Sequence, residues 1–316
     1  MRVVAFGGGH GLSAILRALR LTGEDLGITA VVTVADDGGS SGRLRADRGA
    51  LPPGDLRQAL VALAADDPLA IRTAELLQYR FGGAGELAGH AVGNLLLCGL
   101  MEFYGDSVTA LDHAAMLVGA AGRVLPMSRL PVQIEAEVRG ADPARPSAVV
   151  TVRGQHAVAV TPGTVERVRL EPGEPPACAE AVEAVRTADW LLFGPGSWYT
   201  SVIPHLLVPE LAAAIVAGLA RRLITLNLAN EPETAGLSLA GHLGALARYL
   251  PKLRADVVLA DTRAVGDPEP VRRAAESLGA RLVLAPVAVP DLPDGVPRHD
   301  PVALAAALVP VLGAAR

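Results

Sequence analysis

The stretch RVVAFGGGHGLSAILRALR, residues 2–20, contains the pattern that decides the fold. It opens with a β-rich run, continues with the glycine-rich GGGHG, and ends in leucines that recur at helical spacing. A second apolar run follows at 28–34. Strand, glycine loop, helix and strand in this order predict the start of an α/β fold with a doubly wound, mostly parallel, Rossmann-like sheet.

The same alternation continues along the chain. Apolar runs at 190–194, 222–228, 256–261 and 281–286 are candidate strands, and helical patterns separate them. The segment 68–117 reads as helical. Between 131 and 170 four short alternating runs, VQIEAEV, AVVTV, AVAVT and VERVRL, predict a small antiparallel β insertion. We therefore expect a single α/β nucleotide-sugar-binding domain over 1–316, with a β-rich insertion at about 131–170.

Composition supports a buried parallel sheet and disfavours several classes of protein. Apolar residues make up 51% of the chain and aromatic residues 3%, so Ala, Leu and Val fill the core. The net charge of −5 comes without blocks of like charge, which disfavours a nucleic-acid partner. Apolar stretches are interrupted before about 18 residues, so we expect no membrane insertion. The strand begins too early for a signal peptide, and Cys98 and Cys178 have no metal or redox spacing, so we expect a cytoplasmic protein.

The first glycine loop is a candidate phosphate site. Glycines between a strand and a helix allow close approach of a ligand, and the helix N-terminus offers free N–H groups to an anion. A tight turn without a ligand is the alternative. A nicotinamide fingerprint fails here, because a leucine replaces the third glycine. The candidate residues are Gly7, Gly8, Gly9, His10, Gly11 and Leu12.

The loop VADDGGSSGRLR, residues 34–45, follows the second strand at the same edge of the sheet. Asp36 and Asp37 could hold sugar hydroxyls, or one of them could bind Mg²⁺. Ser40, Ser41 and Arg43 could bind phosphate. A solvated loop with local turns would explain each residue alone, but not the cluster.

Two helical segments carry further polar candidates. In PPGDLRQAL, Asp55 is either a helix N-cap or a ligand group, and Arg57 in the first turn would favour an anionic partner. In GHAVGNLLL, His90 and Asn94 fall within one helical turn. Such a polar pair in an apolar helix must be hydrogen-bonded or face a cavity, and both a structural and a catalytic role stay open for His90.

A second glycine loop, FGPGSWYTSVIP, repeats the pattern of the first. Gly194, Gly196 and Ser197 follow an apolar strand, and Thr200 and Ser201 would open a helix. Two such loops could hold the two ends of a diphosphate-linked ligand. Trp198 and Tyr199 are near enough in sequence to be considered for stacking on a base.

Taken together and in order, these blocks resemble the gluconeogenesis-factor family, the UDP-sugar-binding branch of the 2-phospho-L-lactate transferase superfamily. The most specific blocks are FGGGHGLS, TVADDGGSSGRLR, PPGDLRQ, ELAGHAVGNLLL, FGPGSWYTSVIP and the RHD at 298–300. The resemblance adds Asn227 and Arg298 as ligand candidates. His10 replaces the family's usual threonine, His205 its usual asparagine, and the stretch 227–234 is one residue short.

The resemblance implies a UDP-sugar ligand, with UDP-N-acetylglucosamine expected, and a role in regulating carbon use, cell-wall precursor supply and cell shape. It also implies a regulatory protein partner in cell-wall precursor synthesis, and we expect a homo-oligomer. The alternative is a Mg²⁺-dependent transferase that moves a phospho-group from a nucleotide-linked donor. In that case Asp36 or Asp37 would bind the metal, and His90 or Asn94 would lie near the acceptor. No other cofactor is expected.

Overall fold

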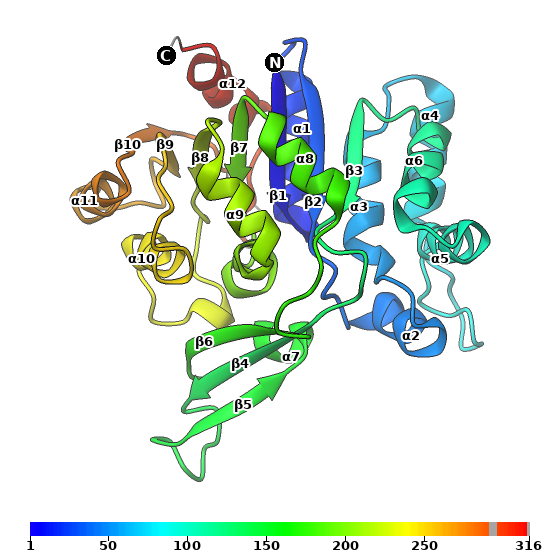
Figure 1. Ribbon diagram of the computed structural model, residues 1–316, viewed down its shortest axis with the longest axis horizontal. Coiled ribbons are helices and arrows are strands. Elements are labelled where there is room, and N and C mark those ends of the chain that lie inside the picture. Colours follow the sequence, from blue (N-terminus) through cyan, green and yellow to red (C-terminus); the bar gives the residue numbers. More distant parts are fainter. Residues whose placement is uncertain (291–295, 315–316) are drawn as a thin grey trace.

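The computed structural model describes residues 1–290 and 296–314 (Figure 1). Its main sheet has seven strands in the order β10-β9-β8-β7-β1-β2-β3, and every neighbouring pair is parallel. The strands are β1 (Arg2–Gly7), β2 (Gly27–Val32), β3 (Gly122–Pro126), β7 (Trp190–Phe193), β8 (Arg221–Thr225), β9 (Val257–Asp261) and β10 (Arg281–Ala285). The predicted fold class is confirmed.

Helices cover both faces of this sheet. In Figure 1, α8 and α9 lie in front of the strands and α1 lies behind them, where it packs between α3 and α12. The helices are α1 (Gly9–Leu21), α2 (Gly39–Arg48), α3 (Pro53–Leu63), α4 (Pro68–Gln78), α5 (Val92–Tyr104), α6 (Ser107–Leu117), α7 (Gln155–Ala159), α8 (Ala179–Thr187), α9 (Pro209–Ala217), α10 (Leu239–Tyr249), α11 (Glu269–Ser277) and α12 (Pro301–Leu312), with short η1 (Trp198–Val202), η2 (Ile203–Leu207) and η3 (Pro232–Thr234). Central strands such as β7, WLLF, are buried throughout, as expected when both faces are covered.

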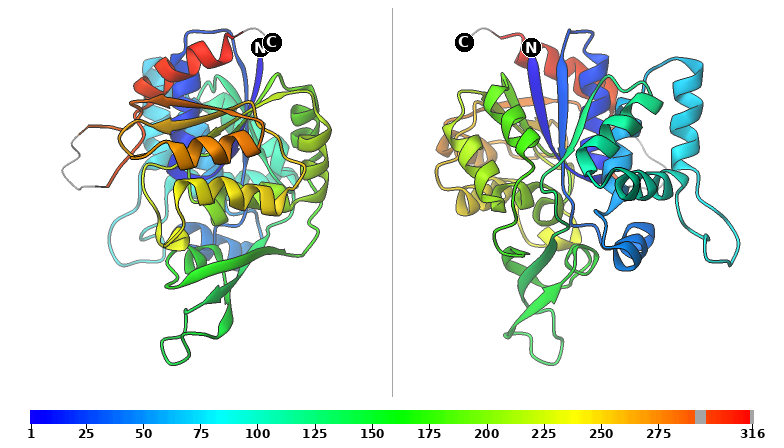
Figure 2. Two further views of the ribbon diagram at one scale, coloured as in Figure 1. Left: turned by 90° about the vertical axis from the view of Figure 1, so that its left-hand side faces the viewer. Right: turned by 45° about the vertical axis from the view of Figure 1, so that its right-hand side comes forward.

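The predicted insertion is present as a three-stranded antiparallel sheet in the order β5-β4-β6. Its strands are β4 (Gln133–Arg139), β5 (Val149–Arg153) and β6 (Thr164–Glu171). It projects from the carboxyl edge of the main sheet in every view (Figures 1 and 2). Helix α7 and strand β6 contact the η1, η2 and η3 segments, so the insertion lies beside the loops that leave β7 and β8.

Three predictions about local structure are wrong. AVAVT, at 157–161, is not a strand, because helix α7 occupies most of it. The segment 68–117 is broken at 79–91, where glycines interrupt the helical pattern, so His90 precedes α5 instead of lying in it. The sheet also has an edge strand, β3, that was not expected; its sequence GRVLP begins with Gly and Arg and ends with Pro, so it does not stand out as an apolar run.

The chain changes direction across the sheet between β1 and β7. Strands β2 and β3 extend the sheet to one side of β1, whereas β8, β9 and β10 extend it to the other side of β7. Open α/β sheets bind ligands outside the carboxyl ends of their strands at such a switch point. Both glycine loops leave the sheet there.

Within the described residues, no single helix is long and apolar enough to cross a membrane. One pair of consecutive helical segments, Trp198–Leu207 with Pro209–Ala217, reaches the required length and composition, but it is bent by 80°.

His205 should make the fold sensitive to acid. Its ring is fully buried, with Nε2 3.0 Å from the Val31 carbonyl oxygen and Nδ1 3.3 Å from that of Val202, and the neutral ring can donate to one of the two. Burial lowers the pKa of His205 to about 4. As the pH falls, the histidine therefore binds a proton at a higher pH in the unfolded chain than in the folded chain. The free energy of unfolding decreases as the pH falls from about 6.5 toward 4.

We expect this group to cost about 2 kcal/mol of unfolding free energy at pH 5 relative to pH 8. Urea unfolding of His205→Asn at both pH values should show a pH dependence reduced by that amount. His156→Gln, at an exposed histidine, is the control. An unchanged pH dependence in His205→Asn would contradict the assignment.

Candidate functional site

The first glycine loop packs directly on the Asp55 carboxylate. A Cβ added to Gly8 would collide with Asp55 Oδ2 and lie 2.7 Å from Thr33 Cγ2. Asp55 is 8% exposed, and the Gly9 N–H bonds its carboxylate. The N-cap of α3 is Pro52, so a capping role for Asp55 is wrong. Its side chain instead packs against Gly8 and Gly9 of the first glycine loop.

Asp36 joins this site from the loop after β2. Its Oδ2 lies 2.7 Å from the point where a Gly54 Cβ would stand, and Ser41 Oγ accepts the Gly54 N–H at 3.0 Å. Burial and the charge of Asp36 together raise the pKa of Asp55 to about 7, against the effects of Gly9 and Arg57. A carboxylate from the loop after β2 and one from α3 therefore share one partly enclosed space.

Arg57 provides the nearest buried positive charge. It lies in the second turn of α3, not the first, because the helix begins at Pro53. Its Nη1 donates to the Leu77 carbonyl and to Gln78, and burial is the main cause that lowers its pKa to about 10. Its Nε has no hydrogen-bond partner. This group can balance part of the charge of Asp36 and Asp55.

The two carboxylates could take part in binding Mg²⁺, but they do not form a complete site. Among residues 1–290 and 296–314, no three His, Cys, Asp or Glu side chains gather as a metal-binding group. Mg²⁺ prefers six oxygen ligands and often takes several from water and phosphate. Asp36 and Asp55 fit such a shared shell, in which a ligand's phosphates would supply further oxygens.

Asp37 has a different partner. Its Oδ1 accepts the His156 N–H at 2.9 Å, at the start of α7, and a Cβ on Gly154 would collide with its Oδ2. This bond satisfies a free donor of the helix end and so favours α7 over the predicted strand. Asp37 therefore attaches the insertion to the loop that carries Asp36.

Ser40, His90 and Asn94 form a buried chain of hydrogen bonds. Ser40 Oγ lies 2.9 Å from His90 Nδ1, and Asn94 Nδ2 donates to Ser40 Oγ at 3.0 Å. Burial and the nearby Arg43 lower the pKa of His90, which favours the neutral ring. Arg43 Nη2 also donates to the Ala88 carbonyl at 2.6 Å. These bonds tie α2 to the 79–91 loop, and the sequence did not show that Ser40 joins the pair.

The second glycine loop packs on the first. A Cβ on Gly11 would collide with the Pro195 carbonyl oxygen and lie 2.7 Å from Gly196 Cα. Asn227 Oδ1 accepts the Gly196 N–H, and Asn227 Nδ2 donates to the Gly196 carbonyl, each at 2.9 Å. Gly11, Gly196 and Asn227 are thus brought together at the switch point. Gly194, Ser197, Thr200 and Ser201 belong to the same segment.

The aromatic candidates for base stacking are enclosed in the protein. Trp198 is 0% exposed, and its Nε1 donates to the His242 carbonyl at 2.9 Å. Tyr199 is 4% exposed. Neither ring presents a face to solvent, so the structure does not support a stacking role for them.

Arg298 lies outside the glycine loops. Its carbonyl accepts the Val289 N–H at 2.8 Å, and its neighbour His299 pairs with Ala288 beyond the end of β10. The structure thus places Arg298 at the same edge of the sheet, several strands away from β1.

Buried polar atoms without a hydrogen-bond partner concentrate at this edge. Among the described residues they include atoms of Thr33, Arg57, Asn94, Thr225, Glu233, His242 and His299, whereas Arg222 lies at the opposite, amino end of β8. Buried polar groups are normally paired with protein or water. Glu233 and His242 were not among the predicted site residues, although Glu233 stands in the polar run NEPET that follows β8.

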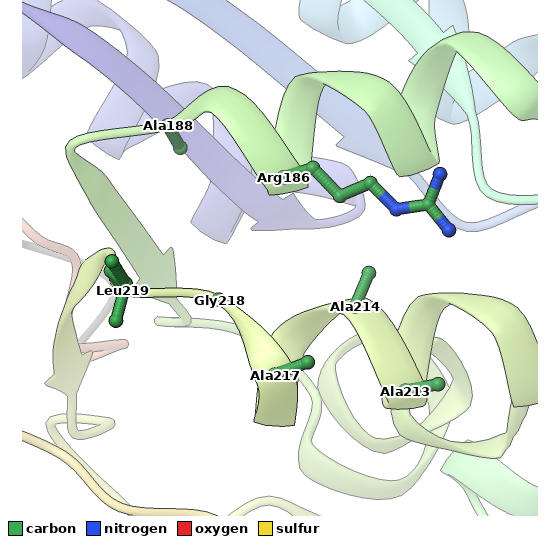
Figure 3. Close-up of a pocket in the computed structure, with 7 residues that line it drawn as sticks. All are labelled: Arg186, Ala188, Ala213, Ala214, Ala217, Gly218 and Leu219. Atoms are coloured by element: carbon green, nitrogen blue, oxygen red, sulfur yellow. The ribbon is translucent and has the colours of Figure 1, made fainter.

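Two cavities lie at opposite edges of the sheet. One, of about 360 Å³, opens where the chain leaves β8 and β9 and is lined by Leu228, Asn230, Ser238, Val265 and Asp267 among others. The other, of about 370 Å³, is shown in Figure 3 between the ends of α8 and α9 and contains Arg186 as its only charged lining residue among those described. Only the first adjoins the polar loops.

Residues 3–283 match the family model described as 2-phospho-L-lactate transferase CofD. The chain belongs to this family. A Mycobacterium tuberculosis protein provisionally named gluconeogenesis factor is 52% identical over 311 residues, which cover 97% of the chain and 89% of that protein. The gluconeogenesis factor of Listeria monocytogenes is 38% identical over 265 residues, or 84% of the chain and 78% of that protein.

The fold of this CofD-family chain also matches a solved structure. A Bacillus halodurans protein of the UPF0052 family superposes with a TM-score of 0.83 at 33% identity, and the match covers 98% of both chains. The family predicted from the motifs is therefore confirmed by sequence and by structure.

Asp55→Asn should stabilise the fold above neutral pH. Because the pKa of Asp55 is raised to about 7, the cost of its charge is absent below pH 3.8 and fully present above pH 7. We expect a gain of roughly 2–4 kcal/mol at pH 8 that disappears at pH 4, measured by urea unfolding. Exposed Glu24→Gln is the control, and equal stability of Asp55→Asn and the parent at pH 8 would contradict this charge assignment.

Proposed function

We propose that this protein binds a UDP-sugar, with UDP-N-acetylglucosamine as the expected ligand, and acts as a regulatory protein. The observation that carries the proposal is the meeting of the two glycine loops with the Asp36–Ser41 loop at the switch point of the sheet. Unpartnered buried polar atoms gather at this same edge. A ligand with phosphates and many hydroxyls would supply the missing partners.

The arrangement suggests where each part of the ligand lies. The N-terminus of α1 would hold phosphate, because its first N–H groups point out of the helix. The cavity at the exits of β8 and β9 would hold the nucleoside, since its lining is mostly apolar with Asn230, Ser238 and Asp267 as polar groups. The sugar would then reach Asp36 at the exit of β2 and Asn94 near the start of α5.

The names of the relatives support a metabolic role. The Listeria protein is called a gluconeogenesis factor. A sensor of UDP-N-acetylglucosamine would connect carbon use with cell-wall precursor supply and cell shape, and it would act in the cytoplasm, where UDP-sugars are made. A protein partner in precursor synthesis and self-association of the chain are parts of the same proposal.

One observation favours the alternative, a phospho-group transferase. Asp36 and Asp55 approach each other at the loop expected to hold phosphate. Mg²⁺ bound there with a donor would neutralise phosphate charge and make a phosphorus atom easier to attack. His90 and Asn94 would orient an acceptor on the α2 side. Phosphorus NMR of a nucleotide-linked donor with protein and Mg²⁺ would show turnover for a transferase and an unchanged spectrum for a binder.

Calorimetry should detect binding of UDP-N-acetylglucosamine, and Arg43→Ala should weaken it. Loss of one hydrogen bond to a charged group costs about 1.5–3 kcal/mol, or roughly 10- to 150-fold in Kd. Arg48→Ala is the matched control, because Arg48 is an exposed arginine of the same helix. No heat at millimolar ligand with a folded protein would refute the proposed function.

A further inference from the structure

The hydrogen-bond donors of the second glycine loop are already used within the protein. Asn227 accepts the Gly196 N–H, and Glu233 Oε1 accepts the Tyr199 N–H at 2.8 Å. Thr200 bonds the Glu233 carboxylate through both its backbone and its hydroxyl. The N–H groups of Ser201 and Val202 donate to the Ser197 carbonyl. Few donors remain here for a phosphate.

The charge of this region also opposes a phosphate. Burial and, to a smaller extent, the charge of the neighbouring Glu231 raise the pKa of Glu233 to about 7. Two carboxylates side by side disfavour a third negative group. The loop after β2 also has acidic side chains, Asp36 and Asp37, but it continues into α2 with Arg43 and Arg45. Residues 194–202 and 227–234 contain no Arg or Lys, so the second loop has no cation of its own to hold a phosphate.

Hydrogen bonds fix the position of Glu231, which lies close to Glu233 on the loop after β8. Its N–H donates to Thr234 Oγ1 at 3.1 Å, and its carbonyl accepts the Thr234 N–H at 2.9 Å. Its carboxylate is half-buried and is hydrogen-bonded by the Ser197 side chain. It lies on the β8 exit loop, only one residue from Asn230 on the cavity wall. Glu233 Oε2, on the same turn, is buried and has no partner.

We propose that Glu231, oriented by Ser197, accepts hydrogen bonds from the ribose hydroxyls of the nucleotide ligand. Dinucleotide-binding sheets also hold ribose hydroxyls with a carboxylate, although theirs lies at the end of the second strand, whereas Glu231 lies at the exit of β8. The ligand then runs from the nucleoside over β8, past ribose at Glu231, to phosphates at the α1 and α2 ends. This inference rests on the proposed function and reverses the expectation that the second loop holds phosphate.

Calorimetry of Glu231→Gln with three probes tests this orientation. The probes are UDP, 2′,3′-dideoxy-UDP and inorganic pyrophosphate. We expect UDP to bind roughly 10- to 100-fold more weakly to the variant, because glutamine has one acceptor oxygen and no charge. Affinity for dideoxy-UDP and for pyrophosphate should match the parent. Glu276→Gln, an exposed glutamate of α11, is the matched control.

Two results of these titrations would overturn the inference, and a third would refute the proposed function. Equal weakening of UDP and dideoxy-UDP would overturn the inference, because a purely structural defect does not depend on the hydroxyls. Tighter binding of pyrophosphate by Glu231→Gln would overturn it as well, since it would place phosphate beside this carboxylate. If the parent protein binds neither UDP nor UDP-N-acetylglucosamine, the proposed function itself fails.

Discussion

The contact between Gly11 and the Pro195–Gly196 peptide is the constraint on which the candidate site depends. It joins the loop after β1 to the loop after β7, the two strands between which the sheet reverses its order. A side chain at position 11 would have to displace backbone atoms, so the approach is possible only with glycine. Because the loops touch, a ligand must lie across their outer surface instead of between them.

The second feature of the site is buried charge that the protein only partly compensates. Asp55 and Glu233 are both nearly inaccessible, and burial raises the pKa of each to about 7. A fold selected for stability alone would place neutral side chains there. Both groups accept backbone N–H bonds from a glycine loop or its adjoining turn. These hydrogen bonds help to fix the conformation of the loops. The two carboxyl groups still have acceptor positions that another molecule could use.

The sequence predicted six of the seven strands of the main sheet, and a candidate site at their carboxyl edge, for one physical reason. Parallel strands are buried on both faces, so they appear as apolar runs, and the loops after them meet at one edge. Contacts between distant segments could not be predicted in this way. Ser40 and His90 are 50 residues apart, and Asp37 and His156 are 119 apart. Only the folded chain shows that two residues adjacent in sequence have different neighbours. Asp36 lies beside Asp55, whereas Asp37 accepts a hydrogen bond from the insertion.

The difference between a binder and a transferase on this scaffold comes down to what completes the environment of Asp36 and Asp55. Burial of Asp55, together with the charge of Asp36, favours a proton on Asp55 near neutral pH, and a protonated carboxyl is a poor metal ligand. A divalent cation would have to displace that proton, so metal binding should be favoured by higher pH and by a ligand that brings its own phosphates. In the absence of metal, the proton lets Asp55 donate one hydrogen bond. Protonated Asp55 can then donate that bond to a phosphate oxygen without breaking any covalent bond, which is the chemistry that a regulatory binding protein requires.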